Sequence, residues 1–569
     1  MPDPVVAPYG AWRSPITPDA VVAGATRLGE LAIDGDEIYW SEGRPAEGGR
    51  TVAVRRASDG RMSALTPVGF NVRSRVHEYG GGAFTVASGT LYFSNFDDGR
   101  VYRQDPGAAP QPISPEAALR YADFALDARR GRLICVREDH REPGCEAVNT
   151  LASLDLDGVR EGQVLVSGGD FYSSPRLSPD GARLCWLAWN HPNMPWDGAE
   201  LWVADLNDDG SLSARTRIAG GVDESIFQPE WSPDGVLHFV SDRTGWWNLY
   251  RWRGGRAEPL HAMEAEFGLP QWVFGMSTYC FEPGGRIICA YTAGGVSHMA
   301  SLDAATGAFE PIDLPYTLVE GLRAGAGQVV FVGGSPAEPP AVVRLDLADR
   351  VGEVLRRSSE AIVDAGYIST PEPIEFPTAG GLTAHAFFYQ SRNPDFSAPP
   401  GDRPPLLVII HGGPTGAADV VFSPEVLFWT SRGFAVVDVN YGGSTGYGRA
   451  YRERLAGRWG VVDVEDCAGA ARFLADRGDV DRARLAIRGG SAGGYTTLCA
   501  LTFRDEFRAG ASYYGIGDLE VLARDTHKFE SRYLDRLIGP YPERKDLYYE
   551  RSPIHFTDRL TCPVIVLQG

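Results

Sequence analysis

The sequence predicts a β-propeller of about seven blades followed by an α/β-hydrolase domain. Three observations support this fold class. Short apolar strands recur over the first two thirds of the chain, strands alternate with helices after about residue 371, and a G-x-S-x-G motif follows a buried strand at 489–493. We expect the propeller over residues 25–365 and the hydrolase domain over 366–569, with residues 1–24 packing outside the blades.

The propeller is predicted from a repeating pattern of strands and turns. Gly, Asp and Pro turns separate the strands, and helical periodicity is almost absent up to about residue 350. The turn Ser-Pro-Asp-Gly occurs twice, at 178–181 and 232–235. Aromatic residues such as Trp186 are expected to pack between blades. The cycles centre on 37–40, 90–93, 132–135, 183–186, 236–239, 286–289 and 328–331.

The hydrolase domain is predicted because the pattern of secondary structure changes after about residue 371. Helical stretches now connect the strands, as parallel strands require. An open sheet with helices on both faces follows, and its active site is expected at the carboxyl ends of the strands. The expected strands are 406–410, 434–439, 485–487 and 509–513, and the helical stretches are 424–432, 448–457, 463–477 and 491–503.

Composition excludes several classes of partner. The 569 residues are 43% hydrophobic and carry a formal net charge of −20, which is unfavourable for binding nucleic-acid phosphates or anionic membranes. The N-terminus lacks a basic and an apolar signal region, and no apolar run approaches the length of a membrane span. We therefore expect a cytoplasmic protein without nucleic-acid or membrane partners.

The sequence predicts no metal and no cofactor. The eight cysteines form no C-x-x-C pair and no His/Cys spacing typical of zinc ligands. The glycine-rich stretch 441–448 is not followed by Lys-Ser or Lys-Thr, so it does not match a phosphate-binding loop.

Ser491 is the predicted nucleophile. The glycines of the motif allow a sharp turn from strand to helix, which exposes the serine hydroxyl above the sheet next to the first N–H groups of the helix. The buried strand 406–410 leads into an H-G-G-type loop at 411–413, a companion feature of such turns in α/β-hydrolases. The context therefore favours an exposed nucleophile over a simple glycine turn.

Several motifs together resemble the prolyl oligopeptidase family of serine peptidases, in its acylaminoacyl-peptidase and aminopeptidase branch, which includes bacterial puromycin-hydrolysing enzymes. The resemblance covers nearly the whole chain. The motifs are HGGP at 411–414, NYGGSTGYG at 440–448, Trp459-Gly460 with Asp463, GGSAGGY at 489–495, and in the propeller HPNMPW at 191–196, SDR at 241–243 and WNLY at 247–250.

The resemblance implies an acyl-enzyme mechanism at Ser491. The backbone N–H groups of Ala492 and Gly413 would stabilise the oxyanion. His411 precedes the oxyanion donors in this type of loop, so we interpret it as a structural or pocket residue rather than as the catalytic base.

The acid and base of a catalytic triad are expected beyond residue 569. In α/β-hydrolases the acid follows a strand after the nucleophile helix, and the histidine comes later. Here that strand is 563–567 and the sequence ends at 569. His527, in a polar segment expected to border the pocket, and His555 are alternative bases, but both precede this strand. We expect a hydrolase domain that is incomplete at its C-terminus and a chain that is close to inactive by itself.

Short peptides or aminoacyl amides are the expected substrates, because a propeller above the active site would exclude large folded proteins. An aminopeptidase needs a carboxylate for the substrate ammonium, and Glu78 and Glu224 are candidates. Salt bridges in blade loops are the alternative role for both. Tyr441 and Tyr495 are expected to line the pocket. Arginines near the loops would instead favour a substrate carboxylate, and the sequence does not decide between these preferences.

The sequence is also compatible with two functions other than that of a peptidase. An esterase or amidase would use the same serine and oxyanion donors. A non-catalytic propeller scaffold with a degenerate hydrolase domain would explain the missing acid and base. Whether the chain forms a homo-oligomer is also left open.

Overall fold

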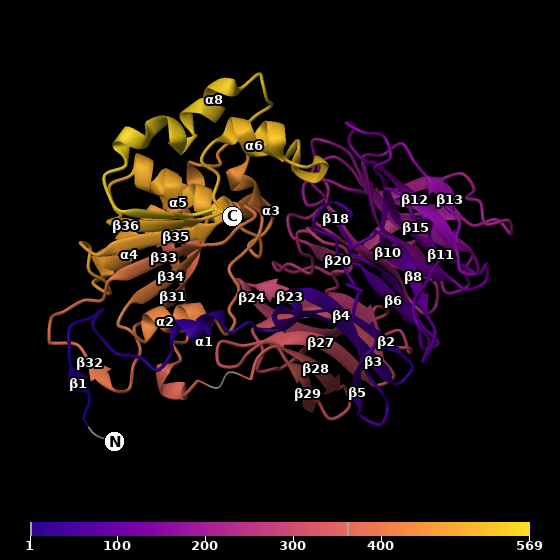
Figure 1. The fold of residues 1–569 in the computed structure, drawn as a ribbon, viewed down its shortest axis with the longest axis horizontal. Helices are drawn as coiled ribbons and strands as arrows, with labels where there is room; N and C mark the ends of the chain where they lie inside the picture. The colour runs from indigo at the N-terminus through magenta and orange to yellow at the C-terminus, as the bar shows by residue number, and fades with distance from the viewer. Residues whose placement is uncertain (1–2, 361–362, 569) are drawn as a thin grey trace.

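The chain folds into a β-propeller and an α/β-hydrolase domain that lie side by side (Figure 1). This computed structural model describes residues 3–360 and 363–568. The predicted fold class is confirmed. Among the helices of these two ranges, none is long and apolar enough to cross a membrane.

The propeller consists of four-stranded antiparallel sheets, each formed by one continuous segment. Over the described residues there are seven of these sheets, which confirms the predicted number of cycles. The blades are β2–β5 (Arg27–Asp34, Glu37–Arg44, Arg50–Arg56, Met62–Ala64), β6–β9 (Phe84–Ala87, Thr90–Ser94, Val101–Gln104, Gln111–Pro112), β10–β13 (Leu119–Asp127, Arg132–Asp139, Val148–Asp155, Gln163–Val166), β14–β17 (Phe171–Leu177, Arg183–Trp189, Glu200–Asp205, Thr216–Gly220), β18–β21 (Ile226–Trp231, Leu237–Ser241, Asn248–Arg253, Arg256–His261), β22–β25 (Tyr279–Phe281, Ile287–Ala293, Val296–Leu302, Phe309–Ile312) and β26–β29 (Leu318–Gly325, Gln328–Gly334, Ala341–Asp346, Gly352–Arg357).

Apolar packing between neighbouring blades holds the ring together. Trp186 is buried in a cluster with Val136 and Leu151 of the preceding blade, as expected for the aromatic positions. The first and last blades share no strand, so side chains close the ring. Trp40 and Val342 belong to one buried cluster across this junction. An ion pair between Arg356 and Glu42 at 2.9 Å also spans it.

The hydrolase domain has a seven-stranded sheet in the order β30-β31-β34-β33-β35-β36-β37. The five strands from β34 to β37 in this order are parallel, and β30 and β31 are antiparallel additions that the sequence analysis did not predict. The strands are β30 (Glu372–Pro377), β31 (Thr383–Tyr389), β33 (Leu406–Ile410), β34 (Ala435–Asn440), β35 (Leu485–Gly490), β36 (Ala509–Tyr513) and β37 (Val564–Leu567).

Helices cover the two faces of this sheet, close to the predicted stretches (Figure 1). The long helix α4 ends at Gly478, whose left-handed backbone accepts the turn. The helices are α2 (Pro424–Thr430), α3 (Arg449–Arg452), α4 (Val462–Arg477), α5 (Ala492–Phe503), α6 (Leu519–Asp525), α7 (Tyr533–Leu537) and α8 (Lys545–Glu550), with short 3₁₀ turns η5 (Lys528–Glu530) and η6 (Pro553–Arg559).

The N-terminal segment packs on the hydrolase domain, outside the blades. Strand β1 (Val5–Val6) pairs in parallel with β32 (Phe396–Ser397), and helix α1 (Pro18–Val22) lies beside α2 (Figure 1). Trp12 and Ile16 are buried against the domain.

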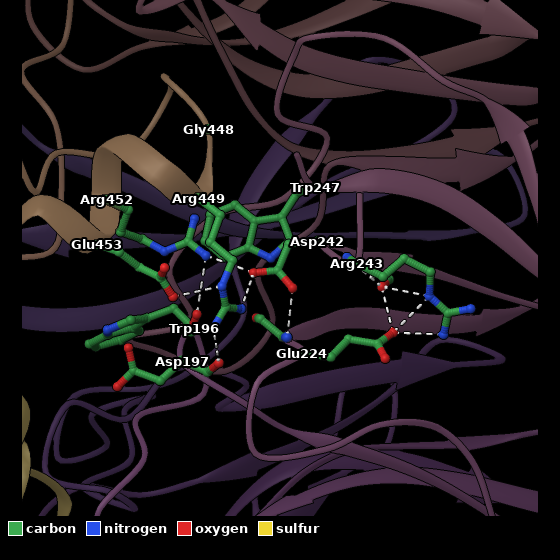
Figure 2. Close-up of polar contacts among 12 residues, drawn as sticks. Trp196, Asp197, Glu224, Asp242, Arg243, Trp247, Gly448, Arg449, Arg452 and Glu453 are labelled. Carbon is green, nitrogen blue, oxygen red and sulfur yellow. Dashed lines mark hydrogen bonds and ion pairs between the residues drawn. The ribbon is translucent and has the colours of Figure 1, made fainter. Parts of the chain in front are cut away.

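A buried ion-pair cluster joins the propeller to the hydrolase domain (Figure 2). Asp242 follows β19, and its Oδ2 accepts hydrogen bonds from Arg449 and Arg452 of α3, both at 2.7 Å. The guanidinium of Arg452 also lies 4.1 Å from the centre of the Trp247 ring. Burial raises the pKa of Asp242, and the two guanidinium groups oppose that shift. Since these charges are withdrawn from water, loss of one partner leaves the others uncompensated.

Candidate active site

Ser491 lies at the sharp turn between β35 and α5, and its side chain is exposed. Its backbone has φ 54° and ψ −121°, an unfavourable conformation for a residue with a side chain. The flanking glycines make the turn sterically feasible. A Cβ on Gly489 would lie 2.4 Å from the backbone of Gly493, and a Cβ on Gly493 would lie 2.5 Å from the carbonyl oxygen of Ile410. This is the geometry expected for the G-x-S-x-G motif.

Two backbone segments converge beside the Ser491 side chain. Helix α5 begins at Ala492, and no side chain caps its N-terminus, so its first N–H groups face the turn. The loop after β33 lies against the turn, because a Cβ on Gly412 would be 3.8 Å from the Cβ of Ser491. Gly413 has φ 121°, a conformation that favours glycine. The start of α5 at Ala492 and the loop that contains Gly413, the two segments predicted to stabilise the oxyanion, thus lie next to Ser491.

His411 is held within this loop rather than beside Ser491. Its Nδ1 lies 2.7 Å from the carbonyl oxygen of Gly412, which can only accept, so Nδ1 carries the proton. Its Nε2 then accepts a hydrogen bond from the Ser444 hydroxyl at 2.7 Å. Burial lowers the pKa of His411 to about 4, which favours this neutral imidazole. The geometry matches the structural role that the sequence indicated.

Tyr441 and Tyr495 are fully buried behind the loop and the helix. The Tyr441 hydroxyl donates to the carbonyl oxygen of Pro414 at 3.0 Å, and its ring stacks on His411 at 4.5 Å. The Tyr495 hydroxyl donates to the carbonyl oxygen of Arg551 at 2.9 Å. Both rings are therefore packed behind the site and expose no surface to a substrate.

Both candidate carboxylates of the propeller are paired with arginine. Glu224 accepts hydrogen bonds from Arg243 and from the Ser241 hydroxyl, each at 2.7 Å (Figure 2). Glu78 forms an ion pair with Arg75. The structure thus shows the salt bridges that were the alternative role for Glu78 and Glu224. Either one would have to exchange its partner in order to bind a substrate ammonium.

Neither alternative base contacts Ser491. His527 lies at the contact with the propeller, where its ring is 5.4 Å from that of Tyr79. His555 is exposed and stacks on Tyr549 at 4.2 Å. Among residues 3–360 and 363–568, no histidine has a hydrogen bond to the Ser491 side chain. Over the same ranges no group of three His, Cys, Asp or Glu side chains is arranged to hold a metal ion.

A chamber made of two cavities opens in the propeller, and its smaller cavity adjoins the loop after β33 of the hydrolase domain. One cavity of 640 Å³ is lined by residues around the propeller axis, including Tyr79, Met276 and Glu320. A second cavity of 210 Å³ shares Met276 and Glu320 and reaches Trp272 and Asp419. Both side chains are exposed to the chamber, and desolvation by the surrounding walls raises the pKa of Glu320 to about 7 and that of Asp419 to about 6.

The sequence analysis missed a group of aromatic and acidic residues where the segment after α6 meets the propeller. Its members are Tyr79, Trp272, Phe529, Glu530 and Tyr533, whose rings and polar atoms contact one another. One sequence signal pointed to this group, because the polar segment around His527 was expected to border the pocket. The propeller members carry no local motif, since only the fold brings them to this position.

The propeller beside the hydrolase sheet and the exposed serine at a strand-to-helix turn define the class as propeller-bearing α/β-hydrolases of the serine type. The sequence profile of the prolyl oligopeptidase family matches residues 420–569. The crystal structure of puromycin hydrolase is similar over 99% of this chain and 88% of its own, with a TM-score of 0.94 and 40% identity. A puromycin-hydrolysing peptidase from Mycobacterium tuberculosis has a TM-score of 0.95 and 41% identity, over 99% of this chain and 89% of its own.

Curated relatives match over shorter stretches. Dipeptidyl peptidase family member 6 of Caenorhabditis elegans is 33% identical over 30% of this chain, and the acylamino-acid-releasing enzyme of Arabidopsis thaliana is 29% identical over 30%. These alignments span only 26% and 23% of the two relatives' lengths. Together with the structural matches, the comparisons show that the chain belongs to the prolyl oligopeptidase family of serine peptidases.

Proposed function

We propose that the protein is a serine peptidase that cleaves short peptides or aminoacyl amides from their N-terminus through an acyl-enzyme on Ser491. The observation that carries the proposal is the exposed Ser491 hydroxyl between the uncapped start of α5 and the 411–413 loop. Glycine contacts on both sides maintain this strained turn, and strain of this kind is concentrated at functional sites.

The chemistry follows from these positions. The Ser491 oxygen attacks the scissile carbonyl carbon and gives up its proton to a base, while N–H groups of Ala492 and Gly413 stabilise the oxyanion. The base then protonates the leaving amine, and water hydrolyses the acyl-enzyme. Among residues 3–360 and 363–568 no histidine forms a hydrogen bond with the Ser491 side chain, so the proposal rests on the serine and the oxyanion donors and assigns no residue as the base.

The substrate class is supported by the chamber and by the relatives. A cavity of 640 Å³ in the propeller and one of 210 Å³ that reaches the hydrolase domain suit a short peptide and exclude a folded protein. Puromycin hydrolase, at 40% identity, has been crystallised as a mutant complexed with PGG. Dipeptidyl aminopeptidase BIII of Pseudoxanthomonas mexicana is 29% identical over 35% of this chain.

The proposal is tested with the protein purified from its source. We expect a fluorophosphonate to label Ser491 and aminoacyl arylamides to be hydrolysed, and Ser491→Ala to abolish both reactions. Cleavage of acyl nitrophenyl esters without cleavage of arylamides would identify an esterase instead. A biological activity that survives Ser491→Ala would support the scaffold alternative.

A further inference from the structure

We propose that Glu530 binds the free α-ammonium group of the substrate, in a subsite whose other walls are Tyr79 of the propeller and the rings of Trp272 and Phe529. This inference rests on the proposed peptidase function and narrows it to substrates with an unblocked N-terminus. It assigns the ammonium to a carboxylate of the hydrolase domain rather than to Glu78 or Glu224.

The segment that carries Glu530 is fixed against the propeller. It follows α6, and Figure 1 shows this part of the chain reaching from the hydrolase domain to the propeller. Lys528 donates hydrogen bonds to the carbonyl oxygens of Ala147 at 2.8 Å and Asp170 at 3.0 Å. The Phe529 ring stacks on His77 at 5.4 Å. The carboxylate of Glu530 is therefore held at a defined position, and the nearby lysine is engaged elsewhere.

Glu530 has a hydrogen-bond donor, but among residues 3–360 and 363–568 it has no lysine or arginine partner. The Tyr79 hydroxyl donates to its Oε1 at 2.8 Å, and Nε2 of His527 lies 3.7 Å from its Oε2. The Glu530 side chain is 19% exposed, and burial raises its pKa. Interactions with Tyr79, His527 and Thr526 lower the pKa, but they offset only part of this increase. A half-buried carboxylate without a cation is costly in free energy. A ligand cation would supply the missing charge.

The surrounding aromatic rings suit a small cation. The Tyr79 ring lies 5.4 Å from Trp272 and 6.1 Å from Phe529, and these two rings are 6.2 Å apart. Aromatic faces attract an ammonium group, and Trp does so most strongly. An acylated amine is uncharged, so neither the carboxylate nor the aromatic rings attract it electrostatically. The subsite thus discriminates between free and blocked N-termini.

The subsite is attached to the loop that lies beside Ser491. The Trp272 indole N–H donates to the carbonyl oxygen of Thr415 at 2.7 Å. The Tyr533 hydroxyl lies 2.6 Å from Oγ1 of the same Thr415. Thr415 follows directly on the HGGP stretch, so an ammonium bound at Glu530 would position the substrate relative to the oxyanion donors.

Asp419 provides a matched comparison. It also lacks an arginine or lysine partner among the described residues and lines the chamber with Glu320, whose negative charge lies nearby. No hydrogen-bond donor to either side chain is seen in the described ranges. Asp419→Asn removes one carboxylate near the site, as Glu530→Gln does, but it leaves the proposed subsite intact.

The experiment compares Glu530→Gln with Asp419→Asn in the full-length protein. We measure kcat and KM for an alanyl arylamide and its N-acetyl derivative. For Glu530→Gln we expect KM for the free amine to rise about 10- to 100-fold, as for loss of a half-buried charge pair, with little change for the acetylated substrate. Tyr79→Phe is expected to give a smaller shift in the same direction. Asp419→Asn should leave the ratio of the two substrates unchanged.

Binding in the Ser491→Ala background separates the subsite from catalysis. Calorimetry with alaninamide and N-acetylalaninamide should show that Glu530→Gln weakens only the free amine. Equal losses for both ligands, no loss, or a larger loss with Asp419→Asn would overturn the inference. If alaninamide binds through Glu530 but Ser491 resists labelling and arylamides are not cleaved, the proposed function fails while the subsite stands.

Discussion

The turn at Ser491 and the subsite at Glu530 are built in opposite ways. The turn depends on glycines within five residues of the serine and on one neighbouring loop. The subsite depends on side chains from the propeller and from a segment about 40 residues after the serine, brought together where the domains meet. The comparison teaches that the nucleophile is a local property of the hydrolase domain, whereas recognition of the N-terminus requires both domains. The predictions below test this division.

The largest expected effect is on the chemical step. Ser491→Ala should lower kcat by a factor of about 10³ or more, because residual catalysis then comes only from the oxyanion donors and binding. Affinity for alaninamide should remain. Single-turnover kinetics and calorimetry measure the two properties separately, and a parallel loss of affinity would show that the turn and the subsite are not independent.

Asp242→Ala should loosen the contact between the domains. Removing this carboxylate leaves Arg452 with only Glu266 at 3.9 Å and Arg449 with only the more exposed Glu453, at a cost of about 3 kcal/mol in the free energy of unfolding. We expect a lower thermal midpoint and a reduced preference for free amines, with Ser491 still labelled at the normal rate. The control is Glu224→Ala, whose ion pair with Arg243 is partly exposed and should contribute about 0–1 kcal/mol.

Gly493→Ala should damage the turn and spare the subsite. Its Cβ would lie 2.5 Å from the carbonyl oxygen of Ile410, so strand β33 or helix α5 has to shift. We expect a loss of about 2–4 kcal/mol in stability and slower labelling of Ser491. Gly517→Ala is the matched control, because nothing lies within 4 Å of its added Cβ. Normal labelling of Gly493→Ala would refute the steric account of the turn.

The smallest effect concerns acid stability. Because burial lowers the pKa of His411 from 6.5 to about 4, the unfolded chain binds more protons than the folded protein between these values. The contribution of His411 to stability should therefore fall as the pH drops from 6.5 towards 4, by about 3 kcal/mol at most. His411→Gln should remove this contribution, so that between pH 6.5 and 4 its thermal midpoint shifts upwards relative to that of the parent protein, whereas His555→Gln on the exposed surface should leave the difference from the parent constant. His77 and His238, whose pKa values burial lowers to about 4, act in the same direction, whereas buried carboxylates such as Glu266 and Asp438, whose pKa values are raised to about 7, act in the opposite direction.

Much of the fold was predictable because its signals are local. Alternating strands and Pro-Asp-Gly turns indicated the seven blades, and most helix and strand boundaries of the hydrolase domain agree within a few residues. Strands β30 and β31 were missed, since they lie at the edge of the sheet without helical connections. Tyr441 and Tyr495 were expected at the pocket but are buried, because proximity in sequence to the serine does not fix which way a ring packs.

The sequence by itself determined the class of fold, the membership of the blades and the turn at Ser491, because strand periodicity and glycine requirements act over a few residues. Only the tertiary structure decided which carboxylates keep an arginine partner. Glu78 and Glu224 are paired with arginines of propeller loops, whereas Glu530 meets Tyr79 across the domain boundary. The physical reason is that electrostatic pairing depends on distance in space, and the packing of two domains sets that distance independently of separation along the chain.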